Sequence, residues 1–249
     1  SLILAEKPSV ARDIAKVLKC NKKGNGFFEG NRYVIIWGLG HLIELESPEH
    51  YGKQYEKWNL ETLPILPKQF RLAVIRSTSK HFHATRKVMQ RKDLDDLIIA
   101  TDAGREGELV ARWIIQKAGW RKPLKRLWIS SQTDKAIKEG FSKLKPGKEY
   151  ENLYKSARAR AEADWLVGLN VTRALTCKYN AQLSAGRVQT PTLTMIVQRE
   201  EEIRKFKSKD YWTIDASVKG FNIHWQDAKS GQMRIFDRAK ADSIVEKVK

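Results

Sequence analysis

Short apolar runs alternate with segments of helical periodicity over the first part of the chain. Residues 1–5 (SLILA) and 97–100 (LIIA) are apolar on both faces, which predicts buried strands of a parallel sheet. Residues 10–18 and 106–118 carry apolar side chains at helical spacing. Further strands are expected at 32–37, 71–76 and 126–129, and further helices at 81–91 and 133–143. This alternation predicts an α/β domain with a mostly parallel sheet.

The pattern changes near residue 147. Residues 149–178 contain one glycine and no proline, which predicts one or two long helices. Another helix is expected to start from a cap at Thr190, with Pro191 in its first position, and to end near residue 206. Residues 211–226 alternate as strands do. We therefore expect three parts: an α/β domain over 1–147, a helical domain over 148–206, and the beginning of a β-containing domain over 207–249.

The charge balance of the chain indicates a polyanionic binding partner. Among 249 residues, 47 are Lys or Arg and 29 are Asp or Glu, so the net charge is +18, of which residues 51–150 carry +11. Such a balance favours a polyanion, and nucleic acid before a membrane surface. No apolar run approaches the roughly 20 residues that a membrane helix needs, and no secretion signal is recognisable. The two separate cysteines, Cys20 and Cys177, fit the reducing cytosol.

Acidic residues follow two of the predicted strands directly. Glu6 and Lys7 come after the first strand, and Asp102 comes after the 97–100 strand. If these strands are neighbours, the two carboxylates converge at the edge where open α/β sheets bind ligands. Asp102 and Glu106 could then share a hard cation such as Mg²⁺. Acids that merely stabilise a helix start, and a salt-bridged Lys7, are the simpler alternatives.

Several motifs together resemble the type IA DNA topoisomerases. The segments that carry the resemblance to the Toprim domain of this family are 5–15 (AEKPSVARDIA), 38–42 (GLGHL) and 102–108 (DAGREGE). Residues 156–173 (SARARAEADWLVGLNVTR) and 183–193 (LSAGRVQTPTL) resemble the signature segments of its DNA-binding domain. The KPS after Glu6 and WNLETLP at 58–64 resemble the bacterial topoisomerase III branch.

The resemblance implies an ATP-independent isomerase that cuts and religates single-stranded DNA by transesterification, for strand passage, relaxation and decatenation, with Mg²⁺ as cofactor. It implies a Toprim domain over 1–147, a single-strand DNA-binding domain over 148–206 and the start of a hinge domain over 207–249. The implied partner is single-stranded DNA, with RNA possible and no membrane. A monomer in the bacterial cytoplasm, associated with the nucleoid, is expected.

Individual roles carry over only where the motifs match. Glu6 resembles the acid that protonates the leaving 3′ oxygen, Lys7 a contact to the scissile phosphate, and Asp102 and Glu106, with Glu6, the Mg²⁺ ligands. The expected DNA-binding residues are Lys7, His41, Arg105, Arg158, Arg160, Asp164, Arg173, Ser184, Arg187, Gln189 and Thr190. Arg158 and Arg160 are two positions apart and do not share a helix face, and Asp164 is spaced to pair with Arg160.

Two departures from the family pattern matter. Gly104 stands where the family often has the middle acid of Asp-x-Asp-x-Glu, which favours one Mg²⁺ over two. The family's nucleophile lies in a Tyr-x-Arg context, and none of the seven tyrosines is followed by arginine two positions later. We therefore expect this chain to be the N-terminal part of such an enzyme, lacking the nucleophile and inactive in cleavage by itself.

Three other readings compete. A Toprim primase or nuclease would use Asp102 and Glu106 directly for phosphoryl transfer, but would have no need of the segments at 156–173 and 183–193. A non-catalytic nucleic-acid-binding module would leave the acidic residues without a task. A dinucleotide-binding protein is disfavoured because the first turn lacks G-x-G-x-x-G.

Overall fold

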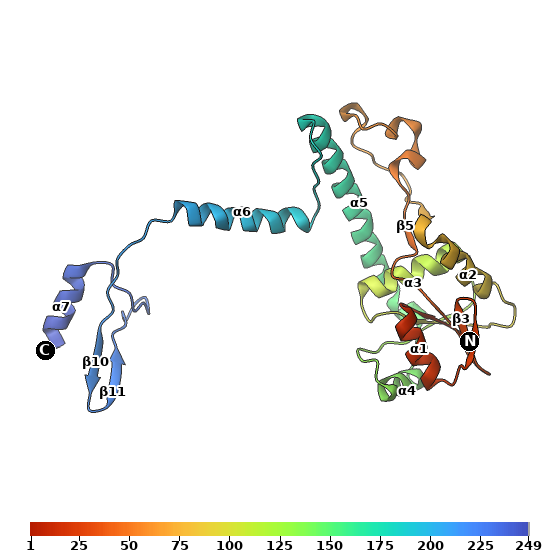
Figure 1. Ribbon diagram of the computed structural model, residues 1–249, viewed down its shortest axis with the longest axis horizontal. Helices are drawn as coiled ribbons and strands as arrows, with labels where there is room; N and C mark the ends of the chain where they lie inside the picture. The colour runs from red at the N-terminus through yellow and green to blue at the C-terminus, as the bar shows by residue number, and fades with distance from the viewer. Residues whose placement is uncertain (249) are drawn as a thin grey trace. The chain divides into compact units, whose positions relative to one another are not determined.

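A seven-stranded sheet organises the first part of the molecule. Figure 1 draws this part of the chain in colours from red to green. The computed structural model describes residues 1–248 and divides into two compact units, Ser1–Thr190 and Pro191–Lys249. The strands of the sheet are β1 (Leu2–Ala5), β2 (Lys22–Gly24), β3 (Phe27–Glu29), β4 (Val34–Trp37), β7 (Leu97–Ala100), β8 (Leu124–Arg126) and β9 (Lys145–Pro146). Their spatial order is β2-β3-β4-β1-β7-β8-β9. The four central strands, β4, β1, β7 and β8, are parallel, and the others pair antiparallel at the two edges.

Helices cover both faces of this sheet. They are α1 (Pro8–Val17), α2 (Ser79–Met89), α3 (Arg105–Ala118) and α4 (Asp134–Ser142). Along β1, Leu2 and Leu4 pack with α2 and α3, whereas Ile3 and Ala5 pack with α1 and α4. Side chains alternate along a strand, so a strand that is apolar throughout must be covered on both sides. The predicted α/β domain with a central parallel sheet is confirmed.

The longest helix, α5 (Glu151–Tyr179), packs against α3. It also holds the segment 46–71, which connects the antiparallel strands β5 (Ile43–Leu45) and β6 (Leu72–Val74). This segment contains three short 3-10 helices, Pro48–Tyr51, Lys53–Tyr55 and Leu60–Thr62; two more lie at Arg76–Thr78 and Gly147–Tyr150. The Asn170 side chain on α5 bonds both the main-chain N–H and the carbonyl of Ile65, at 2.6 and 3.1 Å. The segment is thus irregular but anchored.

The second unit contains a hairpin and a helix. Strands β10 (Asp215–Val218) and β11 (Phe221–His224) pair antiparallel, and α7 (Arg238–Val248) follows. Both turn residues have positive φ, 44° at Lys219 and 86° at Gly220, as a tight hairpin turn requires. The expected alternation over 211–226 is therefore a hairpin. Helix α6 (Gln189–Lys205) runs across the boundary between the units.

Two local expectations were wrong in detail, and one hairpin was not predicted. The strand expected at 126–129 is β8, which ends at Arg126; the chain leaves the ladder after the Leu127 N–H bonds the Ile99 carbonyl. The hairpin β2–β3 was not predicted, because Lys22 and Lys23 give no apolar signal. Thr190 does not cap α6 from outside: the helix starts one residue earlier, and the Thr190 hydroxyl accepts a bond from the Gly186 N–H.

Candidate functional site

Glu6 and Asp102 meet at the carboxyl edge of the sheet. Strands β1 and β7 are parallel neighbours with Ala5 opposite Ala100, so the residues that follow them leave the sheet side by side. The Asp102 main-chain N–H donates a 2.9 Å hydrogen bond to Oε2 of Glu6. The adjacency on which convergence of the two acids depends is therefore present. Lys7 lies exposed at the N-cap of α1.

The turn from β7 into α3 is closely determined, and residues 101–107, which form it, are called the acidic loop below. The Thr101 hydroxyl donates to the Gly107 carbonyl at 2.8 Å, and the Gly104 N–H donates to the Asp102 carbonyl at 2.9 Å. Glu106 is exposed in the first turn of α3, where the unpaired N–H groups favour negative charge. Arg105 is exposed beside it. Backbone bonds thus fix where both acids emerge.

A cavity of about 460 Å³ joins this edge to α5. Its lining includes His41 from the segment after β4, Glu106 and Trp113 from α3, and Arg160 and Asp164 from α5. Predicted site residues from three separate motifs, His41, Glu106, and Arg160 with Asp164, line this one cavity. Arg187, from a fourth motif, contacts Asp164. The cavity is lined by both acidic and basic side chains.

Asp164 organises two of the predicted DNA-binding arginines. Its carboxylate is 2.8 Å from Nη1 of Arg187 and 3.7 Å from Nε of Arg160. The segment carrying Arg187 is tied to α5 because the Thr172 hydroxyl bonds both the N–H and the carbonyl of Ala185. All three charged side chains stay about 40% exposed, so each guanidinium can also reach a phosphate. Ser184 and Gln189 lie exposed on the same segment.

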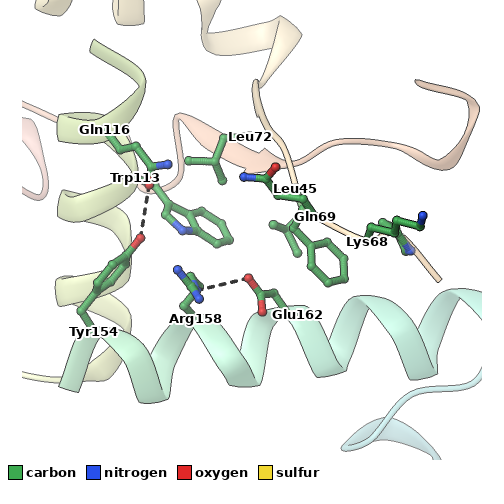
Figure 2. A pocket seen from close by; sticks show the side chains of 11 residues that line it. Leu45, Lys68, Gln69, Leu72, Trp113, Gln116, Tyr154, Arg158 and Glu162 are labelled. Atoms are coloured by element: carbon green, nitrogen blue, oxygen red, sulfur yellow. Dashed lines mark hydrogen bonds and ion pairs between the residues drawn. The ribbon is translucent and has the colours of Figure 1, made fainter. Parts of the chain in front are cut away.

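Arg158 lies away from Arg160, in a different cavity. Figure 2 shows this cavity, of about 380 Å³, between α3, α5 and residues 67–72. Arg158 pairs with Glu162 at 3.2 Å, and the Tyr154 hydroxyl bonds Gln116 at 3.3 Å. Burial raises the pKa of Tyr154. The two arginines therefore line different cavities, which agrees with a spacing that does not put them on one helix face.

Arg173 has a structural position. Its side chain is only 4% exposed, its Nη1 donates to the Tyr55 carbonyl at 2.7 Å, and its guanidinium lies 5.1 Å from the centre of the Trp58 ring. Burial lowers the pKa of Arg173. These contacts anchor the 46–71 segment on α5, and they do not support the predicted contact with DNA. Periodicity could not reveal this, because the partners are more than a hundred positions away.

The acidic residues suit a hard cation by chemistry. Glu6, Asp102 and Glu106 offer carboxylate oxygens, the ligands that Mg²⁺ prefers, and Mg²⁺ commonly uses one or two carboxylates with waters and phosphate oxygens. Within residues 1–248 no group of three His, Cys, Asp or Glu side chains is already gathered closely enough to hold a metal ion. The donor set therefore fits a cation that is completed by water or by a substrate phosphate.

Two buried charged residues escaped sequence reasoning. Glu108 and Arg126 are both 0% exposed, and they form an ion pair of 3.0 Å. Glu108 also pairs with Arg112 at 2.8 Å, one helical turn away. An acid on the apolar stripe of a predicted helix was the available signal, because such a position requires a buried partner.

Comparison with known proteins agrees with the fold. Residues 1–132 match the Toprim domain family and residues 148–249 match the DNA topoisomerase family. The chain therefore belongs to the Toprim-containing DNA topoisomerases.

Individual relatives show which topoisomerases the chain is similar to. DNA topoisomerase 3 of Bacillus subtilis is 62% identical over 238 residues, 96% of this chain and 33% of that protein. DNA topoisomerase 3 of Shouchella clausii is 62% identical over 247 residues, 99% of this chain and 34% of that protein. Full-length topoisomerase I of Thermotoga maritima matches in structure with a TM-score of 0.66 and 27% identity, over 98% of this chain and 37% of that one. The chain thus spans about a third of the length of these relatives.

Two further findings concern metal binding and membrane-spanning helices. Toprim domains bind a divalent metal ion, which is consistent with the acidic edge described above. Among the helices of residues 1–248, none combines the length and apolar character needed to cross a bilayer.

Proposed function

We propose that this chain forms the metal-binding and single-strand DNA-binding part of a type IA topoisomerase of the topoisomerase III kind. The observation that carries the proposal is the hydrogen bond from the Asp102 N–H to Glu6, which brings acids from two parallel strands together beside a cavity lined by Glu106 and Arg160. The whole enzyme would relax and decatenate DNA in the bacterial cytoplasm. Residues 1–147, 148–206 and 207–249 would be its Toprim, DNA-binding and hinge parts.

Asp102 and Glu106 would hold one Mg²⁺, and Glu6, whose carboxylate accepts a bond from the Asp102 N–H, would contribute a third carboxylate. The bound cation would supply positive charge where phosphate oxygens gather. Because carboxylates repel one another, removing the cation leaves Asp102, Glu106 and Glu6 in a less favourable arrangement. Gly104 offers no third acid on the acidic loop, which supports a single ion.

Glu6 would act as the general acid of the cleavage step. A tyrosine hydroxyl, supplied from outside residues 1–249, would lose its proton to solvent and attack the phosphorus, forming an O–P bond as the bond to the 3′ oxygen breaks. Glu6 would give its proton to that oxygen and take it back when the strand is rejoined. Its bond with the Asp102 N–H orients the carboxyl group for this transfer. Lys7, exposed next to Glu6, would meet the scissile phosphate.

Arg160 and Arg187, held by Asp164, would bind the DNA backbone. A single strand fits because arginines can follow a flexible phosphate chain, and the net charge of +18 favours its approach. His41, Arg105, Ser184, Gln189 and Thr190 would complete the groove.

Two titrations of the intact chain test the proposal. Mg²⁺ should raise the melting temperature, and the increase should shrink in Asp102→Asn and Glu106→Gln but persist in Glu139→Gln, an exposed acid on α4. Single-stranded oligonucleotides should bind better than duplexes, with a steep salt dependence. Equal effects of the three substitutions would contradict the metal site. Metal-dependent nicking by the chain itself would instead favour a Toprim nuclease.

A further inference from the structure

Arg126 lies entirely buried beneath the acidic loop. It is the last residue of β8, and its side chain is 0% exposed. Its Nη1 donates to the carbonyls of Thr101 at 2.8 Å, Leu127 at 2.8 Å and Ile99 at 3.1 Å, and its Nη2 donates to the Asp102 carbonyl at 2.6 Å. Two successive carbonyls of the acidic loop therefore face one guanidinium group.

The peptide group between Thr101 and Asp102 is held from both sides. Its carbonyl oxygen accepts from Arg126, and its N–H donates to Glu6 at 2.9 Å. In a trans peptide these two groups point in opposite directions. Fixing the carbonyl on the inner side therefore turns the N–H outward, toward Glu6. The bond that joins the two acids depends on the same peptide plane that Arg126 holds.

Other contacts hold the guanidinium itself in place. Its Nε lies 3.0 Å from Oε2 of Glu108, an ion pair outside the geometry of an aligned hydrogen bond. The guanidinium carbon is 4.9 Å from the centre of the Trp128 ring, which stacks on Tyr150 with 4.8 Å between ring centres. A buried charge persists only when it is paired and hydrogen-bonded, and Arg126 meets both conditions.

We propose that Arg126 is a positioning residue for the acidic site: it orients the Thr101–Asp102 peptide so that Asp102 and Glu6 are presented together to a divalent cation. Arginine suits this task because its fork reaches two successive carbonyls at once, whereas a lysine ammonium is a single point. The effect on cation affinity rests on the proposed metal site at Asp102; the effect on the loop does not.

The test compares two arginines that share one acid. Arg126 and Arg112 both pair with Glu108, but Arg112 donates to the Gly147 carbonyl rather than to the acidic loop. Each is replaced by methionine in the otherwise unchanged chain, where Glu108 keeps the other arginine as its partner. Amide hydrogen exchange at Asp102 in the metal-free chain reports on the peptide, and calorimetry with Mg²⁺ alone reports on the affinity.

Arg126→Met should speed exchange at Asp102 about tenfold or more and weaken Mg²⁺ binding roughly 10- to 100-fold, the range for residues that orient metal ligands. Arg112→Met should leave both near the values of the unchanged chain. Exchange and affinity that match in the two methionine variants would overturn the proposal. If Arg126→Met does not fold, Arg126→Lys decides: exchange at Asp102 as slow as in the unchanged chain would overturn it, and faster exchange would support it.

The metal site and the positioning role can fail separately. The metal site would be refuted if the unchanged chain bound no Mg²⁺, or if Asp102→Asn bound Mg²⁺ as tightly as the unchanged chain does. The exchange rate at Asp102 would still show whether Arg126 holds the peptide.

Discussion

The carbonyl oxygen of Asp102 occupies the space where residue 107 would carry a side chain. A β-carbon placed on Gly107 would lie 2.2 Å from that oxygen, closer than any real contact of this kind. The acidic loop therefore folds directly over the first turn of α3. At Gly104, by contrast, a β-carbon would meet nothing within 4 Å. Two glycines in one short motif thus have opposite tolerances.

Gly107→Ala should displace the Asp102 carbonyl and destabilise the fold by roughly 1–3 kcal/mol, the range for inserting a methyl group into a packed site. The melting-point increase with Mg²⁺ should shrink as well, because Asp102 moves. Gly104→Ala, in open space, is the control and should change both quantities little. Urea unfolding with and without Mg²⁺ measures them. Equal destabilisation by the two substitutions would contradict this account of the acidic loop.

Gly104→Asp should fold and should bind Mg²⁺ more tightly. The position is extended, with φ of −174°, and has room for a side chain, so a third carboxylate can be added to the acidic loop without strain. More ligand charge strengthens cation binding, while the metal-free chain should lose stability through repulsion. Calorimetry gives affinity and stoichiometry. Gly104→Asn is the matched neutral control, and an equal gain in affinity there would rule out charge as the cause.

Arg187→Ala should weaken single-strand binding and lower its salt dependence by about one phosphate contact. Arg158→Ala should have less effect, because Arg158 lines the other cavity and pairs with Glu162. Fluorescence anisotropy with a labelled oligonucleotide over a salt series measures both. If Arg158→Ala lowered the salt dependence of binding more than Arg187→Ala does, the DNA strand would lie along the Arg158 cavity, and the proposed site would be contradicted.

Arg173→Met should loosen the 46–71 segment without changing the salt dependence of DNA binding. The substitution removes the bond to the Tyr55 carbonyl and the contact with Trp58, which together hold the segment on α5. Limited proteolysis should therefore cut this segment sooner, whereas Arg187→Ala should not accelerate cutting. A salt slope reduced as much as in Arg187→Ala would return Arg173 to the DNA groove.

Acid should destabilise the end of β3 through Glu29. The hydrogen bond from Arg91 to Glu29, at 2.6 Å, lowers the pKa of this carboxyl below its ordinary value of 4.5. A lowered pKa in the folded state contributes stability that is complete above the unfolded value and is lost as the pH falls through the folded value. Arg91→Gln should therefore flatten the decline in unfolding free energy below about pH 4.5. Urea unfolding across that range tests it, with Arg12→Gln as the exposed control.

The sequence alone determined the local elements around the site. The apolar runs at 1–5 and 97–100 are β1 and β7, and the residues that follow them are the acids at the sheet edge. The stretch with one glycine and no proline, which predicted a long helix, is α5. These features are readable because burial repeats with the period of the strand or helix, and a period is a property of neighbouring residues. Family motifs added the expected chemistry.

The tertiary structure decided which charged side chains are buried and which stay at the surface. Arg126, Arg173 and Arg187 are the same type of residue, and no local pattern distinguishes them. In the structure, Arg126 holds the acidic loop from within, Arg173 anchors a distant segment, and Arg187 lies at the surface beside Asp164. Strand order, which brings Glu6 to Asp102, was also undetermined until β1 was placed between β4 and β7. Both depend on contacts between residues far apart in the chain. The environment of a charged side chain is set by those contacts, and no local pattern encodes them.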